Sequence, residues 1–279
     1  MYLEGQKLKK RKRGPAWESA DVPDGVYADG LLAERADVEL RKLKDRDQIE
    51  LPDHYHAPRT HRKNPSIHPV NFVHMPARGP VFDETARNLI HGYYACVSYT
   101  DAQIDRLLDE VNQLQLSENT IVVLWGDHGW NLGEHALWCK HSCYETSMQI
   151  PLIVRASGIK GGQRGPGLVE PIDLDPTLCE LSGLKSPDHL QGRSFAGLMK
   201  DSQADWKTAA DGRFQKSDTI RTEKFRFAEY SDAAGKRTSA LLYDHAADPD
   251  ENVNVLEFRQ QVVNQVTKQL HQIKVSGRN

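Results

Sequence analysis

The pattern of hydrophobic and polar positions predicts a helix and a strand in the middle of the chain. From Asp83 to about Leu114, apolar side chains recur at helical spacing with charges between them, which predicts a long amphipathic helix. Asp83 is suited to cap its N-terminus and Glu84 to its first turn. The short apolar run from Ile121 to Trp125 predicts a strand buried on both faces. Together they form an αβ unit, which is typical of a mostly parallel sheet.

Segments on either side of this unit extend the pattern. Residues 30–45 carry leucines at helical spacing between charges, which predicts an amphipathic surface helix. Residues 152–156 predict another buried strand. Asp175-Pro176 is expected to open a short helix that Gly183 closes.

The pattern changes after about residue 204. Short alternating runs predict strands with one exposed face, and a helical pattern closes the chain; the strands are expected at 219–222, 224–230 and 240–244 and the helix at 255–275. We therefore expect two domains. Residues 1–203 form part of an α/β domain, a mostly parallel sheet flanked by helices, and residues 204–279 form a small antiparallel α+β subdomain.

Composition limits the possible functions. A hydrophobic content of 38% and a net charge of −3 argue against both disorder and wholesale nucleic-acid binding. No apolar run approaches the roughly 18 residues of a membrane span, and four cysteines are too few for a disulfide scaffold. The basic run Lys7–Arg13 has no apolar segment after it, so we expect a solvated tail and not a secretory signal. A nucleic-acid patch is the alternative for this run, but no aromatic residues are interleaved with it.

The strongest candidate for chemistry follows the strand at Ile121–Trp125. Asp127 and His128 stand between two glycines, at the strand end where α/β sheets bind ligands. Carboxylate oxygen and imidazole nitrogen are both metal-ligand types, and glycine lets the backbone approach an ion closely. Lys140 follows twelve residues after His128 and could meet an anionic substrate group.

Two weaker candidates are metal sites. The histidines between residues 49 and 80 invite a zinc interpretation, but prolines interrupt the segment and we expect an irregular loop over the surface. Cys139, His141 and Cys143 could bind zinc, although three ligands in so tight a run rarely reach one tetrahedral ion.

The order of motifs around Asp127 resembles the sulfatase family, and its iduronate-2-sulfatase branch in particular. The sequence runs DHGW, LGEH, Trp138 and Lys140, and then IPLIV at residues 150–154. Similar segments occur at residues 93–99, 172–178, 190–195 and 242–254. The resemblance extends from about Gly14 onward but covers only the second half of a sulfatase.

This resemblance implies an alkaline-phosphatase-like α/β fold and hydrolysis of sulfate esters, with sulfated carbohydrates as substrates. Members use a formylglycine, made from a Cys/Ser-x-Pro-x-Arg motif, and a divalent cation that is generally Ca2+. By position, Asp127 and His128 match metal ligands, and Lys140 matches the lysine that binds the sulfate oxygens. Residues that could shape the substrate pocket are Trp130, Glu134 and His135.

Departures from the family pattern change the expectation for activity. None of the four cysteines, and no serine, begins the nucleophile motif. An N-terminal Asp-Asp metal pair is absent, as are the strand and Lys-Pro-His segment expected near Gln48–Ile49. We therefore expect a chain that is inactive alone and lacks an N-terminal half, whereas full-length relatives are exported or lysosomal. The alternatives are a non-catalytic remnant or binding protein, and a phosphoester hydrolase of the same superfamily.

Overall fold

The computed structural model describes Leu51 and residues 81–275, and the chain forms two compact units. Within the described residues, the first unit comprises Leu51, 81–116 and 130–139, and the second comprises 117–129 and 140–275. The predicted helix at residues 30–45, the basic run at 7–13 and the histidine-rich segment lie outside the described residues, apart from Leu51.

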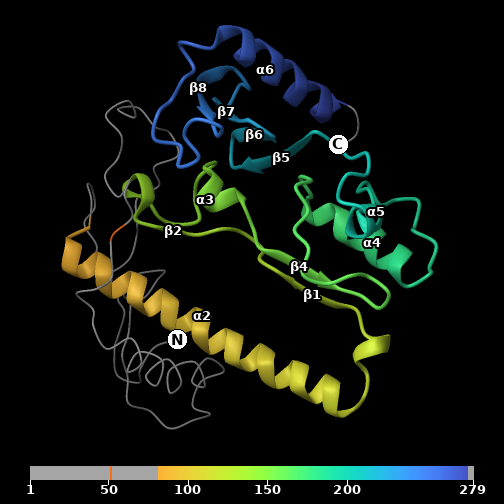
Figure 1. The fold of residues 1–279 in the computed structure, drawn as a ribbon. Helices are drawn as coiled ribbons and strands as arrows, with labels where there is room; N and C mark the ends of the chain where they lie inside the picture. Colours follow the sequence, from red (N-terminus) through yellow and green to blue (C-terminus); the bar gives the residue numbers. More distant parts are fainter. Residues whose placement is uncertain (1–50, 52–80, 276–279) are drawn as a thin grey trace. The chain divides into compact units, whose positions relative to one another are not determined.

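The first unit is built on the predicted long helix, α2 (Asp83–Gln113), which the structure confirms (Figure 1). Asp83 lies inside the first turn and Phe82 occupies the cap position, so the predicted cap is wrong by one residue. Both acidic residues of that turn favour the positive end of the helix dipole. Ala86 and Ile90 are buried on one face of the helix and pack with Trp138.

A small hairpin completes this unit. β2 (Asn131–Leu132) pairs antiparallel with β3 (Trp138–Cys139), and the 3-10 turn η4 (Glu134–Ala136) connects them. The Asn131 side chain donates a hydrogen bond of 2.6 Å to the carbonyl of Cys139. The hairpin packs against α2 through Trp138, which belongs to the same buried cluster as Ile90.

In the second unit, η3 (Ser117–Asn119) leads into β1 (Val122–Trp125), which pairs antiparallel with β4 (Leu152–Arg155). Both predicted strands exist, but the prediction that they are buried is wrong: Trp125 is 52% exposed and Ile153 is 61% exposed. Each has one strand neighbour among the described residues, so their faces lack the cover that a wider sheet between helix layers receives. Every strand pair in the part of the chain that the structure describes is antiparallel, so the expected parallel pairing is not seen there.

Four short helices follow the loop after β1. They are α3 (Glu145–Met148), η5 (Pro171–Asp173), α4 (Leu174–Leu181) and α5 (Ala196–Lys200). The predicted helix opening at Asp175-Pro176 is α4, which begins one residue earlier. Gly183 closes it as predicted, since its φ of +69° is a conformation that favours glycine.

The C-terminal part is a four-stranded antiparallel sheet covered by a helix. The strands are β5 (Ala209–Phe214), β6 (Ser217–Thr222), β7 (Phe225–Ser231) and β8 (Arg237–Asp244), paired in sequence order. Helix α6 (Gln260–Val275) lies across one face (Figure 1). The predicted antiparallel subdomain with a closing helix is therefore confirmed, and β5 is a strand that the sequence did not indicate. The predicted domain boundary at residues 203 and 204 stays a prediction.

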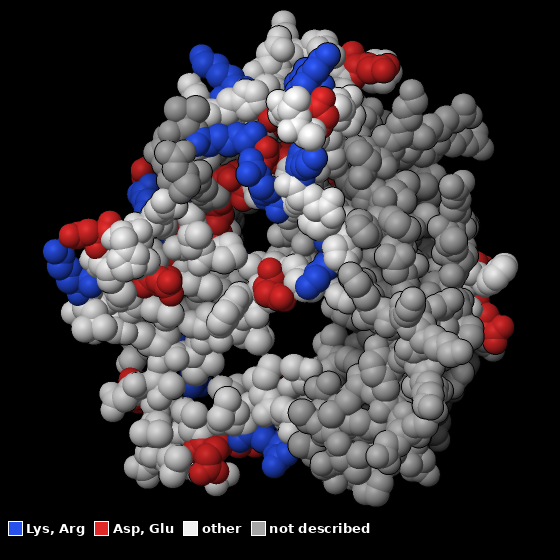
Figure 2. Space-filling model, turned by 180° about the vertical axis from the view of Figure 1, so that it is seen from behind, with Lys and Arg blue, Asp and Glu red and all other residues white. Residues whose placement is uncertain are grey.

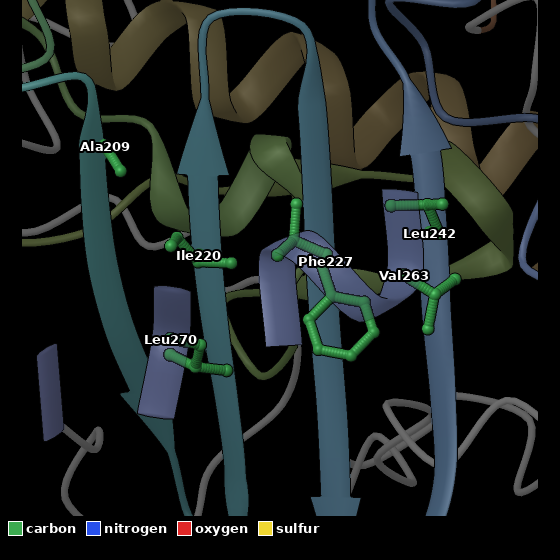
Figure 3. Close-up of a cluster of buried hydrophobic side chains, with 7 residues drawn as sticks. Ala209, Ile220, Phe227, Leu242, Val263 and Leu270 are labelled. Carbon is green, nitrogen blue, oxygen red and sulfur yellow. The ribbon is translucent and has the colours of Figure 1, made fainter. Parts of the chain in front are cut away.

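The core of this sheet lies between its strands and α6. Ile220 on β6 pairs directly with Phe227 on β7, and Phe227 with Leu242 on β8; all three are fully buried. Val263 and Leu270 of α6 cover them (Figure 3). The expectation of one exposed face was wrong for the central strands. Their other face carries Thr219 and Arg226, which are also buried.

No helix among the described residues is long and apolar enough to span a membrane. Figure 2 shows Lys and Arg side chains interleaved with Asp and Glu over the upper part of the described surface. Neither sign of charge dominates there, which agrees with the small net charge of the chain.

Candidate functional site

The loop after β1 is held by backbone contacts. Gly126 donates to the carbonyl of Pro151 at 3.1 Å, and Gly129 donates to that of Ser147 at 2.9 Å. A Cβ atom at Gly129 would lie 2.1 Å from the carbonyl oxygen of Thr146, closer than any real contact. Glycine is therefore required at position 129, because only a residue without a side chain lets the loop pack on α3.

His128 has its ring oriented by this loop. Its Nδ1 lies 2.8 Å from the carbonyl oxygen of Gly129, which can only accept a hydrogen bond. Nδ1 therefore carries the proton, and Nε2 presents its lone pair. The Lys140 ammonium lies 2.5 Å from Nε2 and donates to it. A histidine held in this way through one nitrogen presents the other to a cation.

Asp127 completes the group. Its Oδ2 lies 3.3 Å from His128 Nε2, and its side chain is 82% exposed. An oxygen and a nitrogen lone pair at this separation can both ligate one divalent cation, whose ligand distances are about 2.0–2.6 Å. The Lys140 ammonium already shows that positive charge is accepted beside them. The structure thus brings together all three residues that the sequence singled out around this loop.

These three residues line a cavity of about 840 Å³ within the second unit. Its other walls come from α3, from the loop around Gly167 and from strands β5 and β6. A larger cavity of about 1220 Å³ lies between η5, β5 and α6. Its most buried charges are already paired, because Lys207 bridges Glu170 and Asp173 at 2.6 and 2.5 Å. The smaller cavity is therefore the better candidate site.

A second group of ligand-type residues lies near the first. Glu145, His245 and Glu251 have their ligand atoms within 4.8 Å of one another, the only such group of three found in the part of the chain described. However, the Arg226 guanidinium lies among them. Its Nε is 2.8 Å from Glu145 Oε2 and 3.3 Å from Glu251 Oε1. The guanidinium balances the carboxylates, so a metal ion would have to displace it.

Glu251 connects this cluster to the segment that carries Lys140. Its Oε2 accepts a hydrogen bond of 2.8 Å from the backbone of Glu145, at the start of α3. Its Oε1 lies 2.9 Å from His245 Nε2. Glu251 is 1% exposed and adopts a φ of +58°, which few residues other than glycine do. The cluster is a structural ion network that fixes α3 on the C-terminal sheet.

Charges in this network shift the protonation of Glu145. Burial alone raises the pKa of its carboxyl, but Arg226 and Arg221 outweigh this effect, and the pKa falls below its ordinary range. The Arg221 Nε lies 3.3 Å from Glu145 Oε1. Glu145 is therefore an ion-pair partner held in its charged form and is poorly suited to act as a proton donor.

The alternative zinc site finds no support in the structure. Burial raises the pKa of the Cys143 thiol to about 11, which disfavours the thiolate form that zinc binds. The residues Cys139, His141 and Cys143 do not form a metal-binding group among the described residues. His141 instead packs its ring against Phe214 at a centroid distance of 5.7 Å.

Trp130, Glu134 and His135 belong to the first unit. Trp130 stacks on Tyr93 of α2 with ring centroids 6.1 Å apart, and the backbone of Leu132 donates to the Glu134 carboxylate. His135 is 2% exposed, with a φ of +55° in the turn η4. Their predicted role in a substrate pocket stays a prediction.

Sequence reasoning did not identify Arg213, Arg226 and His245. Arg213 and Arg226 lie on β5 and β7, and His245 directly follows β8. All three are far along the chain from Asp127, and no local spacing relates them to it. The one available signal was the Asp248–Asn254 segment, which was noted as a motif. The structure shows that its Glu251 anchors α3.

Comparison with protein-family models matches two regions of the chain. Residues 37–184 match the model described as Sulfatase. Residues 133–276 match the model described as N-sulphoglucosamine sulphohydrolase, C-terminal. The two matches overlap across the loop that carries Lys140, and each covers about half of the chain.

Several curated proteins are similar in sequence. A sulfatase of Formosa agariphila is 31% identical over 169 residues, covering 60% of this chain and 32% of that protein. Arylsulfatase K of Mus musculus is 29% identical over 205 residues, covering 68% and 37%. Human iduronate 2-sulfatase is 33% identical over 142 residues, covering 42% and 26%. The chain thus spans about a third of the length of these relatives.

Solved structures extend the comparison to the fold. A structure described as a complex with its substrate D-glucosamine-2-N,6-O-disulfate has a TM-score of 0.61 and 27% identity, covering 70% of this chain and 42% of that one. A phosphonate monoester hydrolase from Silicibacter pomeroyi has a TM-score of 0.65 at 23% identity, covering 75% and 45%, and shows the fold alone. The predicted alkaline-phosphatase-like α/β class is thereby confirmed.

Proposed function

Because this chain belongs to the sulfatase family, we propose that it carries the sulfate-binding part of a sulfuric ester hydrolase. The observation that supports this most directly is the convergence of Asp127, His128 and Lys140 in one cavity. Lys140 Nζ and Asp127 Oδ2 lie 2.5 and 3.3 Å from the same imidazole nitrogen. A carboxylate, an imidazole and an ammonium at this spacing suit a sulfate oxygen beside a cation.

Lys140 binds the sulfate group of the substrate in this proposal. Its ammonium is exposed at the cavity and has three donors, so it can exchange the imidazole for sulfate oxygens as substrate enters. A positive charge there offsets the negative charge that develops on the ester during cleavage. His128 remains oriented throughout, because Gly129 holds its Nδ1.

Asp127 and His128 would hold a divalent cation, with Ca2+ as the family expectation. The fit rests on the His128 ring, whose Nε2 lone pair faces the Asp127 carboxylate at 3.3 Å. When bound, such a cation polarises the sulfate oxygens as a Lewis acid. Two protein donors are fewer than the six to eight ligands typical of Ca2+, so substrate oxygens, water or other residues complete the shell.

The proposed substrate is a sulfated saccharide. A relative solved in complex with D-glucosamine-2-N,6-O-disulfate and the similarity to human iduronate 2-sulfatase both support this class. Iduronate 2-sulfate is one member of the class. The match to the N-sulphoglucosamine sulphohydrolase model supports others equally well.

Turnover also needs a nucleophile. The 279 residues contain no Cys/Ser-x-Pro-x-Arg segment from which a formylglycine is made. The proposal therefore assigns binding of the sulfate ester to these residues, and no covalent step.

The test separates binding from turnover. Calorimetric titration of the purified chain with inorganic sulfate, with and without Ca2+, should show calcium-dependent binding that Asp127→Ala and Lys140→Ala abolish. Lys160→Ala, an exposed lysine outside the cavity, is the matched control and should bind as the wild type does. A fluorogenic sulfate ester should remain uncleaved. A folded chain that ignores sulfate would overturn the proposal, while stronger binding of phosphate would favour a phosphoester hydrolase.

A further inference from the structure

The end of strand β5 contributes to the wall of the cavity. Arg213 and Phe214 are its last two residues, and both line the cavity. Phe214 packs on the ring of His141, at a centroid distance of 5.7 Å, and His141 directly follows Lys140 in the sequence. The pair of rings and Arg213 therefore line the same cavity as the proposed sulfate-binding lysine.

Arg213 is placed to donate hydrogen bonds into the cavity. Its side chain is 65% exposed, and its Nε bonds to Asp218 Oδ1 at 2.6 Å. The two terminal nitrogens have no hydrogen-bond partner among the described residues. Asp218 also pairs with Lys274 at 2.5 Å, so its charge is shared between two cations. The guanidinium is anchored at one edge and presents a planar pair of donors at the other.

The other two arginines of the cavity are already committed. Arg226 is 5% exposed and bonds to Glu145 and Glu251. Arg221 is 17% exposed, bonds to Glu145 and donates to the carbonyl of Thr222. Of the three, Arg213 alone has most of its side chain exposed. A fork of two parallel N–H groups matches a carboxylate or a sulfate better than a lysine does.

Size also favours a ligand larger than a sulfate ion. The cavity of about 840 Å³ falls within the range of small-molecule sites, about 300–1,000 Å³. A single sulfate at Lys140 would leave most of it empty, whereas a disaccharide would fill more of it and could also contact the β5 residues in its wall.

We propose that Arg213, together with the His141–Phe214 ring pair, forms a second anion subsite that selects saccharides carrying another acidic group besides the sulfate ester. This group is a carboxylate or a second sulfate. The inference rests on the proposed function, because it takes Lys140 as the place of the first sulfate. The second subsite adds a preference for doubly anionic sugars, and residues of β5 determine this preference.

Three matched disaccharides test the subsite by calorimetric titration of the whole chain in calcium buffer. One carries a sulfate and a uronic-acid carboxylate, one carries two sulfates, and one carries a single sulfate with the carboxylate reduced to an alcohol. We expect one or both doubly anionic probes to bind about tenfold more tightly than the third, because Arg213 would donate a charge-assisted hydrogen bond to the second anionic group. The better of the two identifies the second group.

Substitutions at β5 complete the test. Arg213→Gln should reduce the preference to within about twofold, and Arg213→Lys should retain part of it, because the charge stays but the fork is lost. Arg237→Gln, an exposed arginine on β8 outside the cavity, should leave it unchanged. Calcium-dependent binding of inorganic sulfate should persist in Arg213→Gln, because that variant leaves Lys140 intact.

The outcomes separate the two proposals. If inorganic sulfate binds but the three disaccharides bind alike, or if Arg213→Gln keeps the preference, the second subsite is wrong and the proposed function stands. If neither sulfate nor any disaccharide binds to the folded chain, both proposals are overturned.

Discussion

Two clusters in the second unit contain the same kinds of groups and differ in burial. Asp127, His128 and Lys140 have a carboxylate, an imidazole and a cation around an open cavity, and Asp127 is 82% exposed. In the other cluster, Glu251 and Arg226 are 2% and 5% exposed at their side chains, and His245 is 7% exposed. The exposed cluster is accessible to an ion or a substrate, whereas the charged groups of the buried cluster are paired with one another.

Ligand distances alone would point to the buried cluster as a metal site. Glu145, His245 and Glu251 meet a distance criterion for a cation site, yet Arg226 already supplies the positive charge there. Burying these charges is tolerable only because each one has a partner. Four tests, in order of decreasing expected effect, examine this difference between the two clusters.

The largest effect is expected when the buried network loses its cation. Arg226→Ala leaves Glu145 and Glu251 close together in a buried site, and the free energy of unfolding should fall by about 3–5 kcal/mol. Urea denaturation measures this change. Arg237→Ala, on the neighbouring strand but exposed, should stay within about 0.5 kcal/mol of the wild type. A loss for Arg226→Ala as small as that of the control would contradict the structural role of the network.

The loop that carries the exposed cluster should be destabilised by a side chain at Gly129. Gly129→Ala places a methyl group against the carbonyl of Thr146, which should cost about 1–3 kcal/mol of unfolding free energy and weaken sulfate binding. Gly161→Ala is the control, because a Cβ there meets nothing within 4 Å. Thermal and urea unfolding of both variants measure the difference. Equal stability of the two would show that the loop does not depend on its close packing against α3.

Acid should weaken the buried network. The pKa of Glu145 is lowered in the folded chain, so its charged form contributes stability above the unfolded-state pKa of about 4.5, and this contribution is lost as pH falls through the folded value. We expect the free energy of unfolding to decline below about pH 4.5, and Glu145→Gln to flatten that decline. Urea denaturation between neutral pH and pH 3 measures it. An unchanged slope in the variant would assign the acid sensitivity to other carboxylates.

The smallest effect on stability is expected for substitutions in the proposed sulfate-binding cluster. Asp127→Asn and Lys140→Ala remove groups at the surface of the cavity, so the free energy of unfolding should change by less than about 0.5 kcal/mol. The same variants should lose calcium-dependent sulfate binding. Calorimetry measures sulfate binding and urea denaturation measures stability on the same samples. A large loss of stability would show that these residues, like Arg226, maintain the fold.

Sequence patterns found the helix α2, the strands β1 and β4 and the antiparallel character of the C-terminal part. They failed on burial and on β5. Leu124 and Trp125 were predicted to be buried, yet both are exposed, on a strand with one neighbour among the described residues. β5 holds Asp211 and Gly212 in its middle, which are poor strand formers, and its pairing with β6 decides its conformation.

The family and the candidate loop follow from the sequence alone, because Asp127, His128 and Lys140 lie close together along the chain in a recognisable order. Which charged side chains are already held in ion pairs depends on the fold. Glu145 lies five residues from Lys140, yet it is held by Arg226 and Glu251, 81 and 106 residues away from it along the chain. Long-range strand pairing brings these groups together, and desolvation then requires each charge to find a partner.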